Sequence, residues 1–143
     1  MPDTILVPMD GSESAMRALH LAVERAHVQP QGRVHLVTVH SPLRVYGEIQ
    51  VYVGEKKAAD MAAQYNREIL EPAEQMLRSS GVAFTSSTAE GDAAEQIVEC
   101  AKAVGAGEII MGSRGLGRIA GLVMGSVTTK VVHLTQVPVT LVK

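Results

Sequence analysis

The sequence is poor in aromatic residues and in cysteine. Its 143 residues include no tryptophan, one phenylalanine, three tyrosines and one cysteine. A single cysteine, Cys100, cannot form an internal disulfide, so packing has to hold the fold together. Because aromatic side chains are scarce, the core must consist of Val, Ile, Leu, Ala and Met, which suits a parallel sheet covered by helices.

Charge and hydropathy argue against two classes of partner. The formal net charge is −2, with no block of basic residues, so the positive patch of a nucleic-acid-binding protein is absent. No apolar run approaches the roughly 20 residues that span a bilayer, and the first residues do not have the pattern of a signal peptide. We therefore expect a cytoplasmic protein that neither binds nucleic acid nor inserts into a membrane.

Short β-branched runs alternate with helical periodicity, which is the pattern of repeated βαβ units. Residues 41–55 lack clear periodicity and contain Pro42, Gly47 and Gly54, which predicts a long mobile loop. Pro72 should kink the helix that contains it. Strands are predicted at 4–7, 33–39, 84–89, 108–111 and 138–142, and helices at about 12–27, at about 57–79, after the Asp92–Glu95 capping pair, and at about 126–134.

These elements predict one α/β domain spanning residues 1–143, with no linker and no internal repeat. Right-handed crossovers leave few doubly wound arrangements of five parallel strands. In the strand order 3-2-1-4-5, with helices on both faces, the first and fourth strands are neighbours. Ligands bind outside the carboxyl ends of such strands. The segments 8–10 and 112–115 leave these two strands, so they should converge on one site.

The segment after the fourth strand carries the spacing G-x-x-G, nine residues, G-[ST], with Gly112, Gly115, Gly125 and Ser126 at its fixed positions. Glycines allow a ligand to approach the backbone closely. A helix beginning near Gly125 would direct free N–H groups and its positive dipole end at an anion. The hydroxyls of Ser126 and Thr128 can add donors, although Ser126 can also serve as the helix N-cap. The P-loop and the dinucleotide GxGxxG patterns are both absent.

Together with residues 5–13, this spacing resembles the universal stress protein family, and in particular its ATP-binding branch, over the whole chain. The resemblance implies a Rossmann-like fold of the adenine nucleotide α-hydrolase type. It also implies ATP, or AMP or ADP, across the first and fourth strands, with Mg²⁺ or Mn²⁺ on the phosphates. The implied contacts are Pro8, Met9 and Asp10 on the adenosine side, with Asp10 near the ribose or the metal; Val39 at the adenine; Met111, Gly112, Arg114 and Gly115 beside ribose and phosphates; and Gly125, Ser126, Val127 and Thr128 on the phosphate chain.

The resemblance further implies a two-fold homodimer in which strand 138–142 pairs with its own copy. An apolar edge strand invites such pairing, and in an isologous interface Val139 and Leu141 would meet their counterparts. Higher assembly and a regulatory protein partner stay open.

Three functions are compatible with these features. The first is a regulatory homodimer whose nucleotide changes the loop 41–55, the second is a slow ATPase or nucleotide α-hydrolase, and the third is a nucleotide-free structural dimer. Asp10 could hold the cation, but no second acid or histidine is placed by a motif to orient water, which favours binding with slow or absent turnover. The hydrolases generally carry Ser-Gly-Gly-x-Asp-Ser after the first strand, where this chain has residues 9–12, Met-Asp-Gly-Ser. The intact glycine spacing disfavours the structural dimer.

Overall fold

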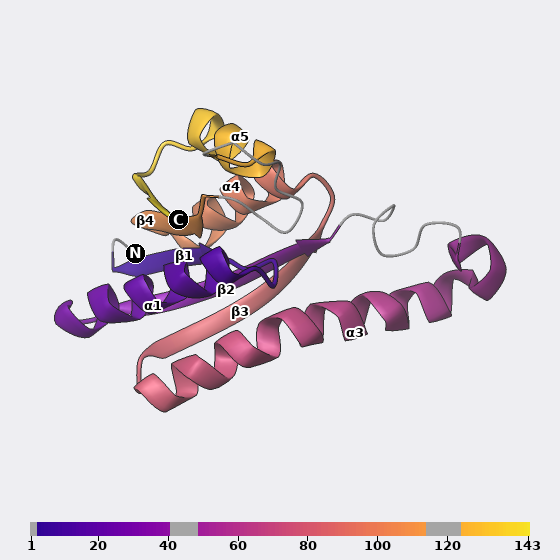
Figure 1. Ribbon diagram of the computed structural model, residues 1–143, viewed down its shortest axis with the longest axis horizontal. Coiled ribbons are helices and arrows are strands. Elements are labelled where there is room, and N and C mark those ends of the chain that lie inside the picture. The colour runs from indigo at the N-terminus through magenta and orange to yellow at the C-terminus, as the bar shows by residue number, and fades with distance from the viewer. Residues whose placement is uncertain (1–2, 41–48, 114–123) are drawn as a thin grey trace.

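The computed structural model describes residues 3–40, 49–113 and 124–143. Five parallel strands form one sheet in the order β3-β2-β1-β4-β5 (Figure 1). This confirms the predicted fold class and strand order. The elements are β1 (Thr4–Pro8), α1 (Glu13–Val28), β2 (Arg33–His40), α3 (Ile49–Ser80), β3 (Ala83–Glu90), α4 (Ala93–Val104), β4 (Glu108–Gly112), α5 (Ser126–Leu134) and β5 (Val139–Val142).

The sheet has an apolar core on each face. Helices α1 and α3 pack on one face and helices α4 and α5 on the other (Figure 1). Alternate residues of β1 enter the two cores, with Val7 on the α1 side and Leu6 on the α5 side, and both are fully buried. A strand covered on both faces has to be apolar at every position, which explains the continuous apolar run at the start of the sequence.

Side-chain caps fix the starts of two helices. Ser12 is the N-cap of α1, and its Oγ accepts a hydrogen bond from the Ala15 N–H at 3.2 Å. Asp92 caps α4 and accepts from the Glu95 N–H at 3.0 Å. Capping bonds of this kind satisfy N–H groups that the first helical turn leaves without partners.

Helix α3 differs from its prediction at its start. It begins at Ile49, so the prediction of a loop is wrong for residues 49–55, while residues 41–48 lie outside the described residues. Gly54 costs only about 1 kcal/mol relative to alanine within a helix, and a helix of 32 residues tolerates this cost. The first turns of α3 extend beyond the carboxyl ends of β2 and β3 (Figure 1).

Pro72 does not end α3, because the helix continues through it to Ser80. The proline lies on the exposed side of the helix, as does Glu68, whose carbonyl loses its intrahelical donor. Water can hydrate that carbonyl, so the proline is tolerated there. Within the described parts of the chain, no helix combines the length and the apolar character needed to cross a bilayer.

Polar side chains connect β2 to the edge strand β3. The ring of His35 lies between two hydroxyls of β3, with Nδ1 at 2.6 Å from Thr85 Oγ1 and Nε2 at 2.8 Å from Ser87 Oγ. Burial lowers the pKa of His35 below its ordinary value of 6.5. The folded protein therefore favours the neutral ring.

We expect stability to decline on acidification because of His35. The unfolded chain takes up a proton near pH 6.5, whereas the folded chain resists protonation, so this contribution is full above that pH and is lost as the pH falls toward the folded-state pKa. His35→Gln cannot titrate and should show a shallower loss of Tm between about pH 7 and about pH 5. The exposed His20→Gln should keep the wild-type slope, and equal slopes for wild type and His35→Gln would contradict this assignment.

Candidate nucleotide site

The sequence-predicted site residues gather at the carboxyl edge of the sheet. This edge holds the ends of β1, β2 and β4 together with the start of α5. Because all strands are parallel, their carboxyl ends share one edge, and β1 and β4 are hydrogen-bonded neighbours there. Arg114 and Gly115 lie outside the described residues.

At the end of β1, Met9 and Asp10 have different environments. The Met9 N–H donates to the Val37 carbonyl at 2.8 Å, and the side chain, only 3% exposed, packs into the core beneath α1 and α3. A ligand at this edge would therefore meet mainly the backbone of Met9. Asp10 is partly buried, and its Oδ1 accepts from the Ser12 N–H at 2.9 Å. This bond fixes the turn into α1 and holds the carboxylate at the edge.

Val39 lies near the end of β2, half-buried on the α4 side of the sheet. The next residue, His40, is buried on the α3 side, where its Nδ1 lies 3.2 Å from Asn66 Nδ2 and its Nε2 lies 3.6 Å from Glu90 Oε2. The imidazole is thus engaged with α3 and β3. Of these two residues, Val39 is the one with a half-buried apolar side chain that could contact the adenine ring of a nucleotide.

Gly112 ends β4 where the first turn of α1 passes very close. A Cβ atom at this position would lie 2.3 Å from Ser14 Oγ and 3.0 Å from the Ala15 nitrogen. A side chain here would require the Ser14 hydroxyl and the start of α1 to shift, so close packing favours glycine at this position. The signal that marked Gly112 as a ligand residue therefore also reports close packing between a strand and a helix.

Gly125, and not Ser126, is the N-cap of α5. Its φ of −78° is extended, and as a glycine it makes no side-chain capping bond. Its own N–H donates to the Ser113 carbonyl at 2.7 Å. Ser126 is therefore the first helical residue, and its side chain is exposed. The first N–H groups of a helix have no intrahelical acceptors, so this end of α5 can accept an anion.

The hydroxyl of Thr128 has a structural partner. Thr128 is 3% exposed, and its Oγ1 donates to the Gly112 carbonyl at 3.1 Å. This bond joins the first turn of α5 to the end of β4. Of the two hydroxyls expected to meet phosphate, only that of Ser126 is exposed.

Lys130, one turn into α5, is paired with α4. Its Nζ lies 3.1 Å from Asp92 Oδ2 and 3.6 Å from Glu95 Oε1. The Glu95 N–H and the Lys130 ammonium hold the pKa of Asp92 below its ordinary value. Exposed ion pairs contribute little stability, but this one occupies the ammonium of Lys130. Among the described residues at the start of α5, the backbone N–H groups are therefore the candidates to bind an anion.

No group of three or more His, Cys, Asp or Glu side chains within residues 3–40, 49–113 and 124–143 is arranged to hold a metal ion. Asp10 alone offers a carboxylate at the end of β1. A divalent cation would therefore fit here only with ligand phosphates supplying further oxygens, which is the usual coordination of Mg²⁺ beside nucleotides.

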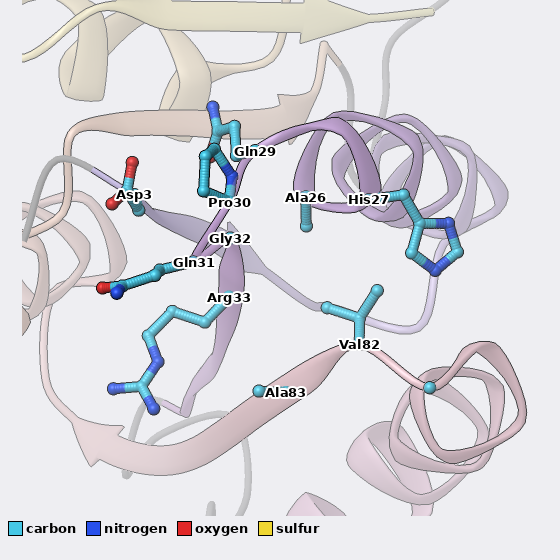
Figure 2. A pocket seen from close by; sticks show the side chains of 11 residues that line it. Asp3, Ala26, His27, Gln29, Pro30, Gln31, Gly32, Arg33, Val82 and Ala83 are labelled. Carbon is cyan, nitrogen blue, oxygen red and sulfur yellow. The ribbon is translucent and has the colours of Figure 1, made fainter.

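A cavity of about 590 Å³ lies at the opposite edge, among the amino ends of β2 and β3 and the last turn of α1 (Figure 2). His27, one of its lining residues, has its Nε2 at 3.0 Å from the Ser80 carbonyl. Ligands of doubly wound sheets bind at the carboxyl ends, whereas this cavity lies at the amino ends of β2 and β3. Its lining residues are Asp3, Ala26, His27, Gln29, Pro30, Gln31, Gly32, Arg33, Gly81, Val82 and Ala83.

Known proteins resemble this chain over its full length. Residues 1–143 match the model of the universal stress protein family. The sequence is 32% identical to universal stress protein YxiE of Bacillus subtilis, covering 100% of both chains. The fold is similar to that of hypothetical protein MJ0577, with a TM-score of 0.86, 27% identity and coverage of 100% of this chain and 96% of the other. It also resembles a universal stress protein from Archaeoglobus fulgidus in complex with dAMP, with a TM-score of 0.68, 25% identity and coverage of 98% and 97%.

We expect Thr128→Val to destabilise the protein by about 1–3 kcal/mol, because it leaves the Gly112 carbonyl without its hydroxyl donor. The matched control is Thr129→Val, since the exposed Thr129 hydroxyl only bonds back to the Gly125 carbonyl. That change should stay within about 0.5 kcal/mol. Urea denaturation measures both values, and similar costs at the two positions would show that the Thr128 bond has no special role.

Proposed function

This chain belongs to the universal stress protein family, and we propose that it is a cytoplasmic, ATP-binding regulator that acts as a homodimer of single universal stress protein domains. In this proposal the nucleotide changes the segment that leaves β2, and with it the contacts to a regulatory partner.

The start of α5 is the observation that carries this proposal. Its N-cap, Gly125, has no side chain to cover the first-turn N–H groups, and the hydroxyl of Ser126 is exposed beside them. We assign the phosphate chain to the backbone of Gly125, Ser126, Val127 and Thr128 and to the Ser126 hydroxyl. Anion cradles built from N–H groups hold phosphate without a lysine.

The adenosine would lie across the ends of β1 and β2. In this arrangement Pro8 and the Met9 backbone border the nucleoside, Val39 contacts the adenine, and Asp10 contacts the ribose or a bound Mg²⁺ or Mn²⁺. The same assignment gives Met111, Gly112, Arg114 and Gly115 to the ribose and phosphates. The relative crystallised with dAMP supports an adenine nucleotide as ligand, and AMP and ADP are the alternatives to ATP.

Binding without rapid hydrolysis fits the side chains at this edge best. Hydrolysis requires a group that orients the attacking water. Asp10 is engaged by the Ser12 N–H, and His40 is buried next to Asn66. Neither group is arranged as a base toward the start of α5, so slow ATP hydrolysis is the weaker alternative.

The proposed dimer uses the outer edge of β5. The carbonyls of Pro138 and Val142 accept hydrogen bonds from β4. Because backbone groups alternate along a strand, the N–H and C=O groups of Val139 and Leu141 point away from β4. The side chains of these two residues pack against the α4 and α5 core. Pairing between copies would therefore be made mainly by backbone groups.

Nucleotide binding is tested by thermal melting with ATP and magnesium. At about 100 times the dissociation constant, a ligand adds roughly 2.7 kcal/mol, or roughly 5–10 °C in Tm. Gly125→Asp should abolish this shift, because its carboxylate caps α5 but repels phosphate. Gly125→Asn is the neutral control of the same shape and should keep more of the shift. An undiminished ATP shift in Gly125→Asp would exclude the start of α5 as the phosphate site.

The dimer is tested with Val139→Pro, which removes one outward N–H group from each copy while the bonds to β4 remain. Losing two symmetry-related hydrogen bonds of about 1 kcal/mol each should weaken the dimer more than tenfold. Val139→Thr keeps the N–H and the shape and should dimerise like the wild type. Sedimentation equilibrium gives the dissociation constants. A wild-type monomer, or equal constants for both variants, would refute pairing through β5.

A further inference from the structure

Four polar side chains form a cluster on the α4 side of the sheet, between β2 and the edge strand β3. His35 comes from β2, Thr85 and Ser87 come from β3, and Cys100 comes from α4. Both chain neighbours of His35 enter the core beneath α1 and α3, so strand alternation directs its ring to the α4 side. Cys100 packs against the core on that side. The cluster lies along the middle of the strands, and the proposed nucleotide function does not use it.

Hydrogen-bond distances connect the four groups in a line. Cys100 Sγ lies 3.8 Å from Ser87 Oγ. The His35 ring follows, with Nε2 at 2.8 Å from Ser87 Oγ and Nδ1 at 2.6 Å from Thr85 Oγ1. Burial raises the pKa of the Cys100 thiol, so the sulfur keeps its proton and donates it to Ser87 Oγ. Ser87 then donates to Nε2, and Nδ1–H donates to Thr85. This arrangement of protons gives every group in the line a partner.

These groups match the constellation of acyl transfer, in which a serine is bonded to a histidine that a third group orients. Ser87 Oγ is the nucleophile, His35 Nε2 is the base, and the Thr85 hydroxyl holds the ring. Burial lowers the pKa of His35 below 6.5, so at neutral pH the ring is neutral and accepts a proton. Ser87 is partly exposed on the last strand of the sheet, within reach of solvent (Figure 1).

We propose that Ser87 is an acylation site, at which the serine accepts the acyl group of an activated ester or acyl phosphate with His35 as general base. In this step the bond from Ser87 Oγ to the acyl carbon forms, and the bond from that carbon to the leaving oxygen breaks. The Oγ proton passes to His35 Nε2 and then to solvent, while the leaving group departs as an anion. Thr85 contacts only the base and is a positioning residue. The product is one acyl ester per chain.

The neighbouring serine provides a matched control. Ser86 is exposed on the same strand, but alternation directs its side chain to the α3 side, where its hydroxyl donates to a carboxylate oxygen of Glu74. A carboxylate is a much weaker base than a neutral imidazole. Ser86 thus shares the strand and the hydroxyl with Ser87 and differs from it in the basicity of its partner.

The test is incubation with p-nitrophenyl acetate at neutral pH, followed by intact mass and peptide mapping. Wild-type protein should gain one acetyl ester on Ser87 and release an equal amount of p-nitrophenolate. His35→Gln should slow this acetylation about a hundredfold or more, because general-base catalysis contributes factors of that size. Ser87→Ala should lose the ester, and Ser86→Ala should react like the wild type. Melting curves establish that each variant is folded.

The orienting role of Thr85 is tested on the same reaction. Thr85→Val keeps the shape but removes the acceptor for Nδ1–H, so it should slow the acetylation of Ser87. Thr85→Ser restores the hydroxyl and should restore the rate, which a loss of packing alone would not allow. A slow Thr85→Ser variant with a wild-type Tm would overturn this role.

The pH profile separates base catalysis from simple exposure of a hydroxyl. A hydroxyl without a base reacts in proportion to the hydroxide concentration, whereas the rate at Ser87 should follow the fraction of neutral His35. Since the pKa of His35 lies below 6.5, the wild-type rate should be constant above that pH and fall at lower pH. Cys100, the titratable group next to Ser87, has a raised pKa and keeps its proton at neutral pH and below. This profile also decides the case if His35→Gln does not fold.

Three results would overturn the proposal. Acetyl groups found only on lysines or on Cys100 would show that Ser87 is not the nucleophile. Equal rates at Ser87 in folded His35→Gln and wild type, or a wild-type rate that rises in proportion to hydroxide, would show that His35 is not the base. Binding of ATP is measured separately, and its presence or absence leaves these outcomes unchanged.

Discussion

Two hydrogen bonds at the junction between β4 and α5 fix the geometry on which the proposed nucleotide site depends. The Gly125 N–H bonds to the Ser113 carbonyl and the Thr128 hydroxyl bonds to the Gly112 carbonyl. These two bonds hold the start of a helix against the end of a central strand. The helix dipole and the first-turn N–H groups then have a fixed position at the carboxyl edge, where a doubly wound sheet binds its ligands. A cradle of backbone groups recognises an anion only if the backbone is held in place.

Some glycine and hydroxyl residues in this region have structural partners, and others are open at the surface. Gly112 lets α1 approach β4, and Thr128 joins α5 to the same strand. Gly125 leaves the helix start uncovered, and Ser126 presents an exposed hydroxyl. A motif that is regular in sequence therefore combines positions that hold the fold together with positions that are open to a ligand in the proposed function. Substitutions of Gly112 or Thr128 should mainly alter the stability of the fold. Substitutions of Gly125 or Ser126 should mainly alter the affinity for the proposed nucleotide.

The charge distribution agrees with recognition by backbone groups. Lys130, one turn into α5, is paired with Asp92 and Glu95 of α4. This pairing links the starts of the two helices. At the first turn of α5, the helix dipole and the free backbone N–H groups then supply the positive potential. Such groups bind a phosphate at low cost in reorganisation, but they do not supply a base or a mobile cation for hydrolysis. A nucleotide bound in this way would act as a signal through its binding and release and not through its hydrolysis.

The sequence by itself determined most element boundaries, because apolar periodicity, caps and turn residues are local signals. The alternation of strands and helices, with right-handed crossovers, limited the strand order to few arrangements. It also brought the ends of β1 and β4 together, because parallel connectivity puts them at one edge. It failed at residues 49–55, where weak periodicity concealed the start of α3. It left open whether Ser126 caps α5, and the structure gives that position to Gly125. Only the tertiary structure showed which side chains and backbone groups at the candidate site already have partners within the fold. The core takes the side chain of Met9, α1 takes the space above Gly112, and Thr128 bonds within the fold while Ser113 keeps an unpaired hydroxyl. These partners come from contacts between segments that are distant in the sequence, so no local pattern of residues predicts them.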